Sequence, residues 1–411
     1  MEGAGMSYRS VRTKRDNQQW MLDLALNLKG RVQNFEADHP ETPPGGRARN
    51  YRMYSKVWRQ AGEHHESLAR IAHQEGFRAT AVEHYDQAIE SFRFAQHSIF
   101  YDDHPVKIGL WDKINELVDQ RSEVTAYPVE RVEVPFEGQT ISCLLHLLPD
   151  RRPAPCIIYT PGMDQTKESF PRPHRNLAVE RGMHVLSMDG PGQGISNIKK
   201  IRAVGDMYEQ AGRAVIDYLV ERPEVDESRI GLFGISMGSY WSLRIADADD
   251  RIAAVASAVA CFNPNNTLFT QASPRFKQMF MYMAGTDDET EFDRMASEMT
   301  TQGHLAAIRC PTLLATGEFD PLCPLEDALG AFAELETAKE LWVVENQSHL
   351  LTNLPNLGGL DIHHYIMDWM HRALVEGRFA DRRIAYVKEN GAGPFSDCEW
   401  TPTVTENDAY F

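Results

Sequence analysis

Apolar residues near the start of the chain recur at the spacing of an amphipathic helix. Trp20, Leu24 and Leu28 repeat every four positions within residues 17–35, which places them on one face of a helix. The sequence PETPPGG at residues 40–46 ends this pattern, because proline and glycine interrupt helices. We therefore predict one amphipathic helix in this first segment.

Two further helical stretches follow at residues 52–75 and 78–100, and Gly76 separates them as a helix stop. One apolar face of the second stretch consists of Ala81, Tyr85, Ala88, Ile89, Phe92, Ala95 and Ile99. A single pair of helices is too short to form a solenoid, which stacks several repeats. We expect residues 1–127 to form a helical cap that packs on a larger domain.

The pattern changes to that of strands near Pro128. Residues 131–136 and 140–148 are alternating or fully apolar and flank Glu137-Gly138, which predicts an antiparallel hairpin. Strands and helices then alternate. Short apolar runs predict strands at residues 156–160, 184–188, 229–233, 252–259, 312–316 and 340–344. Helical spacing predicts helices at residues 173–181, 206–220, 237–248, 325–335 and 359–374.

Repeated strand–helix units after a hairpin predict an α/β fold, with a mostly parallel, doubly wound sheet covered on both faces. We assign residues 128–385 to this domain and residues 386–411 to a C-terminal tail. Residues 261–306 interrupt the alternation, because they carry no strand signal and are rich in Phe and Met. We expect this stretch to pack over the domain as a lid or to form part of its core.

The charge balance narrows the classes of function. The 411 residues include 42 Lys+Arg and 59 Asp+Glu, which gives a net charge of −17 and repels phosphate backbones and anionic membrane surfaces. The chain has neither the apolar core of a signal peptide nor a run of about 20 apolar residues. We expect a cytoplasmic protein that binds neither nucleic acid nor membranes.

One motif points to a particular chemistry. GISMG at residues 234–238 follows a predicted strand and precedes a predicted helix. In a G-x-S-x-G sequence of this kind the serine lies on a sharp strand-to-helix turn, which only small neighbours permit and which exposes the serine Oγ. We predict that Ser236 is a nucleophile.

A Ser-His-Asp triad on this fold would have its acid and then its histidine further along the chain, each beyond the end of a strand. Asp320 follows the predicted strand 312–316, and His349 follows the predicted strand 340–344. We choose these two residues over other acids and histidines nearby, which are Glu318, Glu326, Asp327, His304, His363, His364 and His371.

Each of these residues would have a distinct role. His349 would remove the Ser236 proton during attack and return it to the leaving group, and Asp320 would orient the imidazole and stabilise its cation. Two backbone N–H groups, those of Met237 and Met163, would bind the oxyanion. The candidate substrate-binding residues are Phe100, Tyr101, His104, Met163 and Asp164.

Motifs for metals and cofactors are incomplete. The six cysteines form no CxxC pair and are predicted to be buried free thiols in a reducing compartment. His64-His65-Glu66 lacks the second histidine of a zinc motif. The glycines of MDGPGQG, residues 188–194, lack the spacing of a dinucleotide loop and favour a tight loop beside the active-site mouth. We expect no cofactor and no metal.

The motifs together resemble those of a known family. A helical N-terminal segment combined with Gly162-Met-Asp-Gln-Thr-Lys-Glu168, DGPGQG, GISMG, GEFD and NQSH is similar to a group of α/β-hydrolases. This group includes bacterial 2,6-dihydroxypseudooxynicotine hydrolase, the fungal polyketide-shortening hydrolases and FrsA-like proteins. The resemblance implies an α/β-hydrolase fold with a helical cap over the substrate and, in several members, cleavage of a C–C bond next to a ketone. Where the family hydrolase has an additional carboxylate beyond the serine turn, this chain has Cys261-Phe-Asn-Pro-Asn-Asn-Thr and no acid.

Several functions would use the same three residues. The leading hypothesis is hydrolysis of a small-molecule carbonyl substrate, either at a C–C bond in a β-diketone, acyl-phenol or polyketide-like compound, or at an ester. An acyltransferase or thioesterase-like enzyme would pass the acyl group to an alcohol or amine instead. An oligopeptidase of the prolyl type would carry a propeller of short strands, whereas the preceding residues here are helical. A non-catalytic scaffold is the remaining alternative, and the apolar helix faces would suit a homodimer.

Overall fold

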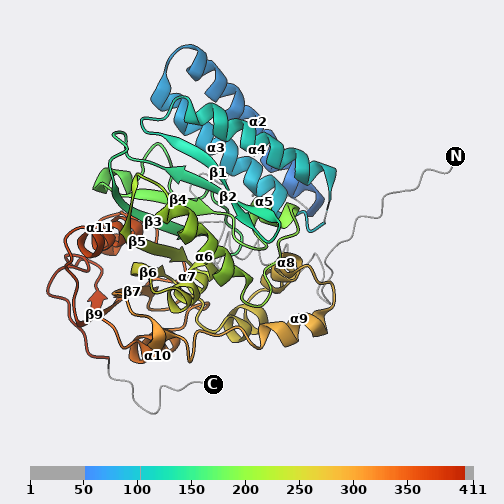
Figure 1. Cartoon of the computed structure of the whole chain (residues 1–411). Coiled ribbons are helices and arrows are strands. Elements are labelled where there is room, and N and C mark those ends of the chain that lie inside the picture. The colour runs from blue at the N-terminus through green and yellow to red at the C-terminus, as the bar shows by residue number, and fades with distance from the viewer. Residues whose placement is uncertain (1–50, 102, 403–411) are drawn as a thin grey trace.

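The computed structural model of the chain describes residues 51–101 and 103–402. The helix predicted at residues 17–35 lies outside these residues. Figure 1 shows a layer of helices above a central twisted sheet that carries further helices on its faces.

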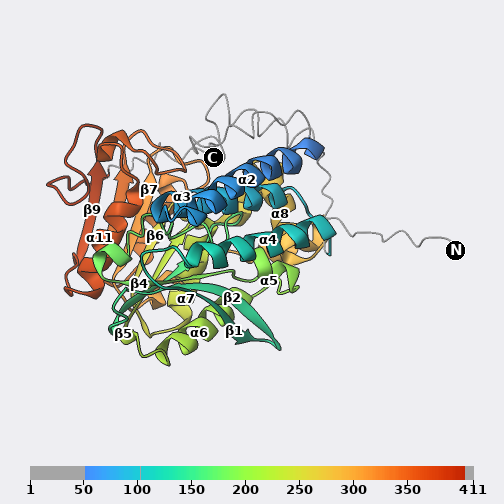
Figure 2. The same cartoon turned by 90° about the horizontal axis from the view of Figure 1, so that it is seen from above.

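Three long helices form the layer, and Figures 1 and 2 show them side by side. Their bounds are α2, Tyr51–Gln74; α3, Arg78–His97; and α4, Pro105–Ser122. The sequence predicted α2 and α3 to within a few residues, and it missed α4. Proline is the first residue of α4, where a helix needs no N–H donor, and the side chain of His104 caps this end by accepting from the N–H of Val106 at 3.2 Å.

Close packing and one buried ion pair hold the three helices together. Gly62 of α2 lies against the ring of Phe92 in α3, where an added Cβ would come within 2.8 Å of the ring. Arg121 of α4 contacts Asp86 of α3 at 2.6 Å, and both side chains are buried. Asp86 also contacts Nδ1 of His174 at 2.9 Å. Since His174 belongs to the sheet domain, Asp86 joins the helical layer to that domain.

The sheet has nine strands in the order β1-β2-β4-β3-β5-β6-β7-β8-β9. In this order, each strand from β4 onward is parallel to the next one, up to β9. The strand β2 is antiparallel to both β1 and β4. The bounds are β1, Val129–Phe136; β2, Gln139–His146; β3, Ala154–Thr160; β4, His184–Met188; β5, Val225–Ile235; β6, Ile252–Ala258; β7, Thr312–Gly317; β8, Lys339–Val344; and β9, Arg382–Val387. The predicted hairpin and the predicted mostly parallel sheet are confirmed.

Helices cover both faces of the sheet, as a doubly wound fold requires. Helices α6, α7, α8 and α10 bury their apolar sides in one hydrophobic core, and α11 buries its apolar side in a second core on the opposite face. The bounds are α5, Gly194–Ile198; α6, Met207–Val220; α7, Met237–Ala248; α8, Pro274–Ala284; α9, Glu289–Ala296; α10, Leu325–Glu334; and α11, Ile362–Leu374.

Two sequence predictions differ from the structure. The helix predicted at residues 173–181 is wrong, because only Val179–Arg181 forms a single 3-10 turn. Asn176 begins this turn by accepting from two backbone N–H groups through its side chain. The predicted domain end at residue 385 falls inside β9, a short strand that pairs with β8 and that the sequence analysis missed.

The segment 261–306 contains helices and, in agreement with its sequence, no strand. It begins with a π-helical segment, Asn265–Gln271, and continues through α8 and α9. Phe269, Phe280 and Phe292 form a buried aromatic cluster with ring centroids 5.0–5.9 Å apart. The ring of Tyr282 in α8 lies 5.9 Å from that of Phe100, which follows α3. The segment therefore contributes to the core and also touches the helical layer.

Among the described residues, none of the helices has the length and apolarity that crossing a membrane would demand.

We expect the Asp86→Ala substitution to lower the free energy of unfolding by about 3–5 kcal/mol, because it leaves the buried guanidinium of Arg121 without its partner. Burial alone would raise the pKa of Asp86, but Arg121 and His174 outweigh burial and hold this pKa below its ordinary value. The contribution of Asp86 is therefore present at neutral pH and is lost as the pH falls through the lowered pKa. Urea denaturation at pH 7 and at a series of pH values below 3.8, the ordinary pKa of Asp86, would measure both effects.

The matched control is Asp119→Ala, which removes an exposed carboxylate that pairs with Arg131 at 3.0 Å. Exposed pairs contribute about 0–1 kcal/mol. Equal losses in the two variants would contradict the role given to Asp86.

Candidate active site

Ser236 lies at the turn between β5 and α7, with backbone angles φ 55° and ψ −123°. A positive φ is strained for a residue with a side chain, and the surroundings of the turn enforce it. An added Cβ at Gly238 would overlap the carbonyl oxygen of Thr160, and one at Gly234 would overlap the carbonyl group of Gly238. The two glycines of GISMG are therefore required by contact with neighbouring backbone.

The structure brings together the three side chains that the sequence analysis selected. Nε2 of His349 lies 2.9 Å from Oγ of Ser236, and Nδ1 of His349 lies 2.9 Å from Oδ2 of Asp320. Asp320 follows β7 and His349 follows β8, so both come from loops at the carboxyl edge of the sheet. The exposed fractions are 7%, 5% and 3% for Ser236, His349 and Asp320, and water therefore competes little for these hydrogen bonds.

The environment of Asp320 favours one arrangement of protons. Its Oδ1 accepts hydrogen bonds from the backbone N–H groups of Leu322 at 2.8 Å and Cys323 at 3.0 Å. A carboxylate only accepts, so the imidazole proton is assigned to Nδ1 of His349. Nε2 is then free to accept the hydroxyl proton of Ser236. This arrangement suits general-base activation of the hydroxyl.

A thiol lies next to the hydroxyl. Sγ of Cys261, just beyond β6, is 3.6 Å from Oγ of Ser236. Burial raises the pKa of the Cys261 thiol to about 12. Because the thiolate is the reactive form of cysteine, Cys261 is a poor nucleophile at neutral pH and does not compete with Ser236.

Two backbone N–H groups are available near the turn. Met237 is the first residue of α7 and Met163 follows β3, and among the described residues neither amide has a backbone acceptor. Gln193 steadies the Met163 loop, because its Nε2 donates to the carbonyl oxygen of Gly162 at 2.6 Å. Both amides keep the free donor that an oxyanion hole needs.

A buried ionic cluster fixes the loop that carries Met163. Nζ of Lys167 lies 2.9 Å from Oδ2 of Asp189 and 2.7 Å from Oε1 of Glu168. Asp189 also accepts from the backbone N–H of Lys167 at 2.9 Å. Burial lowers the pKa of Lys167, but the two carboxylates outweigh burial and raise it, so the ammonium stays charged. The cluster ties the loop after β3 to the loop after β4.

Among the other acids and histidines weighed from the sequence, Glu318 and His304 have different partners, and Glu326 and Asp327 lie in the first turn of α10. Glu318 accepts from the hydroxyl of Tyr386 at 2.8 Å. Nδ1 of His304 contacts Asp247 at 2.9 Å. The remaining histidines, His363, His364 and His371, belong to α11.

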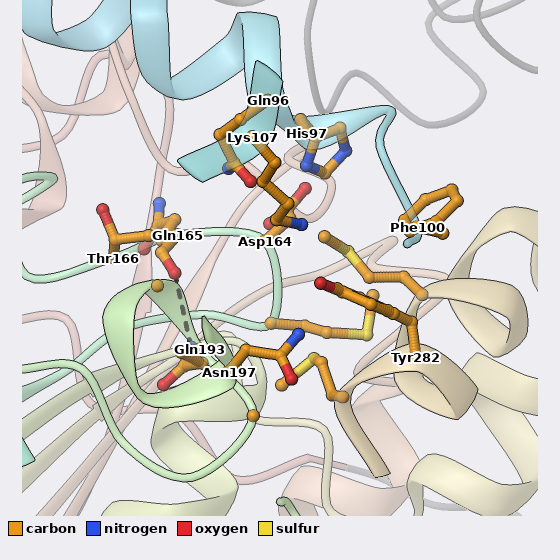
Figure 3. Close-up of a pocket in the computed structure, with 15 residues that line it drawn as sticks. Gln96, His97, Phe100, Lys107, Asp164, Gln165, Thr166, Gln193, Asn197 and Tyr282 are labelled. Carbon is orange, nitrogen blue, oxygen red and sulfur yellow. Dashed lines mark hydrogen bonds between the residues drawn. The ribbon is translucent and has the colours of Figure 1, made fainter. Parts of the chain in front are cut away.

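A small cavity of about 30 Å³, with both polar and apolar residues in its lining, lies beside the Met163 loop, between the helical layer and the sheet domain. Figure 3 shows Gln96, His97 and Lys107 on one side of it and Gln193, Asn197 and Tyr282 on the other; a hydrogen bond joins Gln193 to Gln165. Three of the predicted substrate-binding residues line it, Phe100, Met163 and Asp164.

Tyr101 and His104, which were also predicted to bind substrate, do not line this cavity. His104 caps α4, and its ring lies 5.7 Å from the ring of Tyr101. His104 therefore begins a helix that was not predicted from the sequence.

A larger cavity of about 390 Å³ reaches His349 and Ile235, the residue before Ser236. Arg93 and Phe94 of α3 line it together with Gln165, so Gln165 borders both cavities. This volume falls in the range of small-molecule sites, about 300–1,000 Å³.

The fold and the serine turn define the class of this protein, which is that of the α/β-hydrolases. The sequence model of the FrsA-like esterases matches residues 108–343, more than half of the chain, and the chain belongs to this family. Because named members of the group are hydrolases and esterases, the protein is an α/β-fold hydrolase.

Relatives agree with this assignment. The chain is 29% identical to a hydrolase of Paenarthrobacter nicotinovorans named for 2,6-dihydropseudooxynicotine, over 76% of this chain and 84% of that one. It is 30% identical to an α/β hydrolase of Penicillium citrinum, gkaG, over 54% of this chain and 55% of that one. The crystal structure of 2,6-dihydroxy-pseudo-oxynicotine hydrolase superposes with a TM-score of 0.68 at 25% identity, covering 80% of this chain and 91% of that one.

Sequence reasoning missed the residues that hold the site in place. Lys167 and Glu168 were quoted only as part of a family motif, and Asp189 only as part of a glycine-rich loop. A lysine and acids inside otherwise apolar loop sequences were the available signal, because buried charges occur in proteins when they are paired.

We expect Lys167→Met to lower the free energy of unfolding by about 3–5 kcal/mol, because it leaves two buried carboxylates without their cation. The activity that remains should also fall, since the loop with Met163 loses its anchor. Thermal unfolding and ester hydrolysis measure the two effects. The control, Lys200→Met, alters an exposed pair with Asp103; the account of the cluster is wrong if both variants behave alike.

Proposed function

We propose that the protein is a serine hydrolase in which Ser236 is the nucleophile, His349 the general base and acid, and Asp320 the residue that orients His349. The observation that carries this proposal is the continuous pair of 2.9 Å contacts from Asp320 through His349 to Oγ of Ser236. The order of the three residues along the chain is the order used on this fold.

Acylation begins when Oγ of Ser236 attacks the substrate carbonyl carbon while Nε2 of His349 takes the hydroxyl proton. The carbonyl oxygen becomes an oxyanion, which the N–H groups of Met237 and Met163 bind. His349 then returns the proton to the leaving group, and the acyl group remains on Ser236. Water, activated by His349, releases the acyl group as a carboxylic acid.

The substrate class that we propose is a ketone with an adjacent C–C bond that can be cleaved, with esters as the simpler alternative. Cleavage of a C–C bond requires the departing carbanion to be delocalised into a second carbonyl group or an electron-rich ring. The relative from Paenarthrobacter nicotinovorans is named for hydrolysis of a pseudooxynicotine, and this supports a ketone substrate here. The cavity beside His349 has room for a small molecule.

Acyl transfer is a second candidate function, and the burial of all three side chains favours it. A site that admits little water gives an alcohol or amine a better chance to intercept the acyl group on Ser236. Product analysis with and without an added amine distinguishes the two reactions, since only transfer yields an amide.

We expect Ser236→Ala to lower kcat on a p-nitrophenyl ester by about a millionfold, the loss typical of removing a nucleophilic serine. Asp320→Asn should lower kcat by about ten-thousandfold, because it removes the group that fixes the imidazole tautomer. A fluorophosphonate probe should label the wild-type protein at Ser236 and leave Ser236→Ala unlabelled. Steady-state kinetics and mass spectrometry provide the measurements.

Ser228→Ala is the matched control, because Ser228 is an exposed serine at the opposite end of the same strand. Its labelling and kcat should equal those of the wild type. Undiminished hydrolysis by Ser236→Ala would contradict the proposed function.

A further inference from the structure

Asp164 is a buried carboxyl group for which the proposed mechanism has no use. Asp164 is 5% exposed, and its Oδ1 has no hydrogen-bond partner among the described residues. The backbone carbonyl of Asp164 is held by Nη1 of Arg93 at 2.8 Å, so the position of the residue is fixed. An unsatisfied buried oxygen is costly in a folded protein and points to a missing ligand.

The unpartnered carboxyl of Asp164 lines the small cavity beside the Met163 loop. Figure 3 shows Asp164 between the side chains of the helical layer and those of the sheet domain. The cavity volume of about 30 Å³ exceeds the roughly 10–15 Å³ that a cavity needs to hold one water molecule. It therefore has room for a single oxygen-bearing group.

The cavity lies next to a backbone group that would take part in the proposed reaction. Asp164 directly follows Met163, whose N–H is a candidate oxyanion donor, and adjacent Cα atoms are about 3.8 Å apart. Once His349 has taken the proton of Ser236, its charge acts on the Asp164 carboxyl. An oxygen atom bound at Asp164 is therefore a near neighbour of the carbonyl group that Ser236 would attack.

Burial favours the acid form of this carboxyl. Burial raises the pKa of Asp164 above its ordinary value, although Arg275, Arg93 and His349 act in the opposite direction. A neutral carboxylic acid is a hydrogen-bond donor, and a buried aspartic acid of this kind can stabilise an enolate oxygen.

We propose that Asp164 is a catalytic residue that donates a hydrogen bond to the second carbonyl oxygen of a 1,3-dicarbonyl substrate. This inference rests on the proposed function and specifies its substrate class. The first carbonyl oxygen binds at Met163 and Met237, and the second binds at Asp164.

The bonds and electrons of the reaction balance with these residues. Oγ of Ser236 forms a bond to the first carbonyl carbon, and His349 takes its proton. The C–C bond then breaks, and its electron pair becomes an enolate whose oxygen is held by Asp164. His349 returns the proton to the carbanion carbon, which releases a ketone. Water then cleaves the acyl-Ser236 bond, which releases a carboxylic acid.

A comparison of two substrates tests the proposal with the full chain. One is 1-phenylbutane-1,3-dione, which has the second carbonyl, and the other is p-nitrophenyl butyrate, which lacks it. We expect Asp164→Ala to lower kcat/KM for the diketone by about 100-fold or more, the usual loss of one oxyanion donor. The loss for the ester should be at least tenfold smaller. Asp164→Asn keeps an N–H donor of similar size and should recover at least tenfold of the diketone activity.

A surface variant and a folding measurement make the result decisive. Asp150→Ala removes an exposed carboxylate that pairs with Arg152 and should leave both activities at the wild-type level. If circular dichroism shows that Asp164→Ala does not fold, Asp164→Asn decides alone, with an expected loss on the diketone that exceeds its loss on the ester.

Three outcomes overturn the inference: equal losses on both substrates, an Asn variant no better than the Ala variant, or a wild-type enzyme that cleaves the ester and not the diketone. None of these touches the role of Ser236. Failure of the proposed function has a different signature, which is that Ser236→Ala still cleaves both substrates.

Discussion

The site depends on the sharp backbone turn between strand β5 and helix α7 that carries Ser236. The positive φ of Ser236 costs on the order of 1–3 kcal/mol, and neighbouring backbone leaves no room for a Cβ at either flanking glycine. A hydrogen bond of 2.9 Å from the N–H of Ser236 to the carbonyl of Ala258 in β6 holds the turn on the sheet. The strain places Oγ within 2.9 Å of His349 and presents the N–H of Met237 beside it.

Buried ion pairs hold the loops around the site and the helical layer in position. Lys167 joins two loops through Asp189, and its ammonium lies 5.5 Å from the ring of Trp111 in α4. Asp86 connects α3 to His174 of the sheet domain. Such pairs add little net stability but are costly to break, so they specify where the helical layer meets the loops. The cavity with Asp164 lies at this junction.

Most of the sheet could be predicted from the sequence, because buried parallel strands are short apolar runs bounded by turns. The strand β9 was missed, since RRIAYV carries two arginines and resembles a loop. The helix α4 was missed because it has only a weak apolar stripe. The residues before Val179 were wrongly predicted as helical, although the segment is rich in proline. The three candidate catalytic residues could be selected by their order and their strand ends. Contacts between loops, such as that of Lys167 with Asp189, could not be predicted from the sequence. The spacing of residues along the chain does not show which loops come together in the fold.

The central claim is that an acyl group passes through Oγ of Ser236. The most direct test is acid quenching during turnover of an aryl ester, followed by tryptic digestion and mass spectrometry. Ser236 and Cys261 fall in different tryptic peptides, residues 230–244 and 252–275. The account predicts that the first peptide gains the mass of the acyl group, with fragmentation assigning it to Ser236. An acyl group found on Cys261, or none on either peptide during steady turnover, would contradict it.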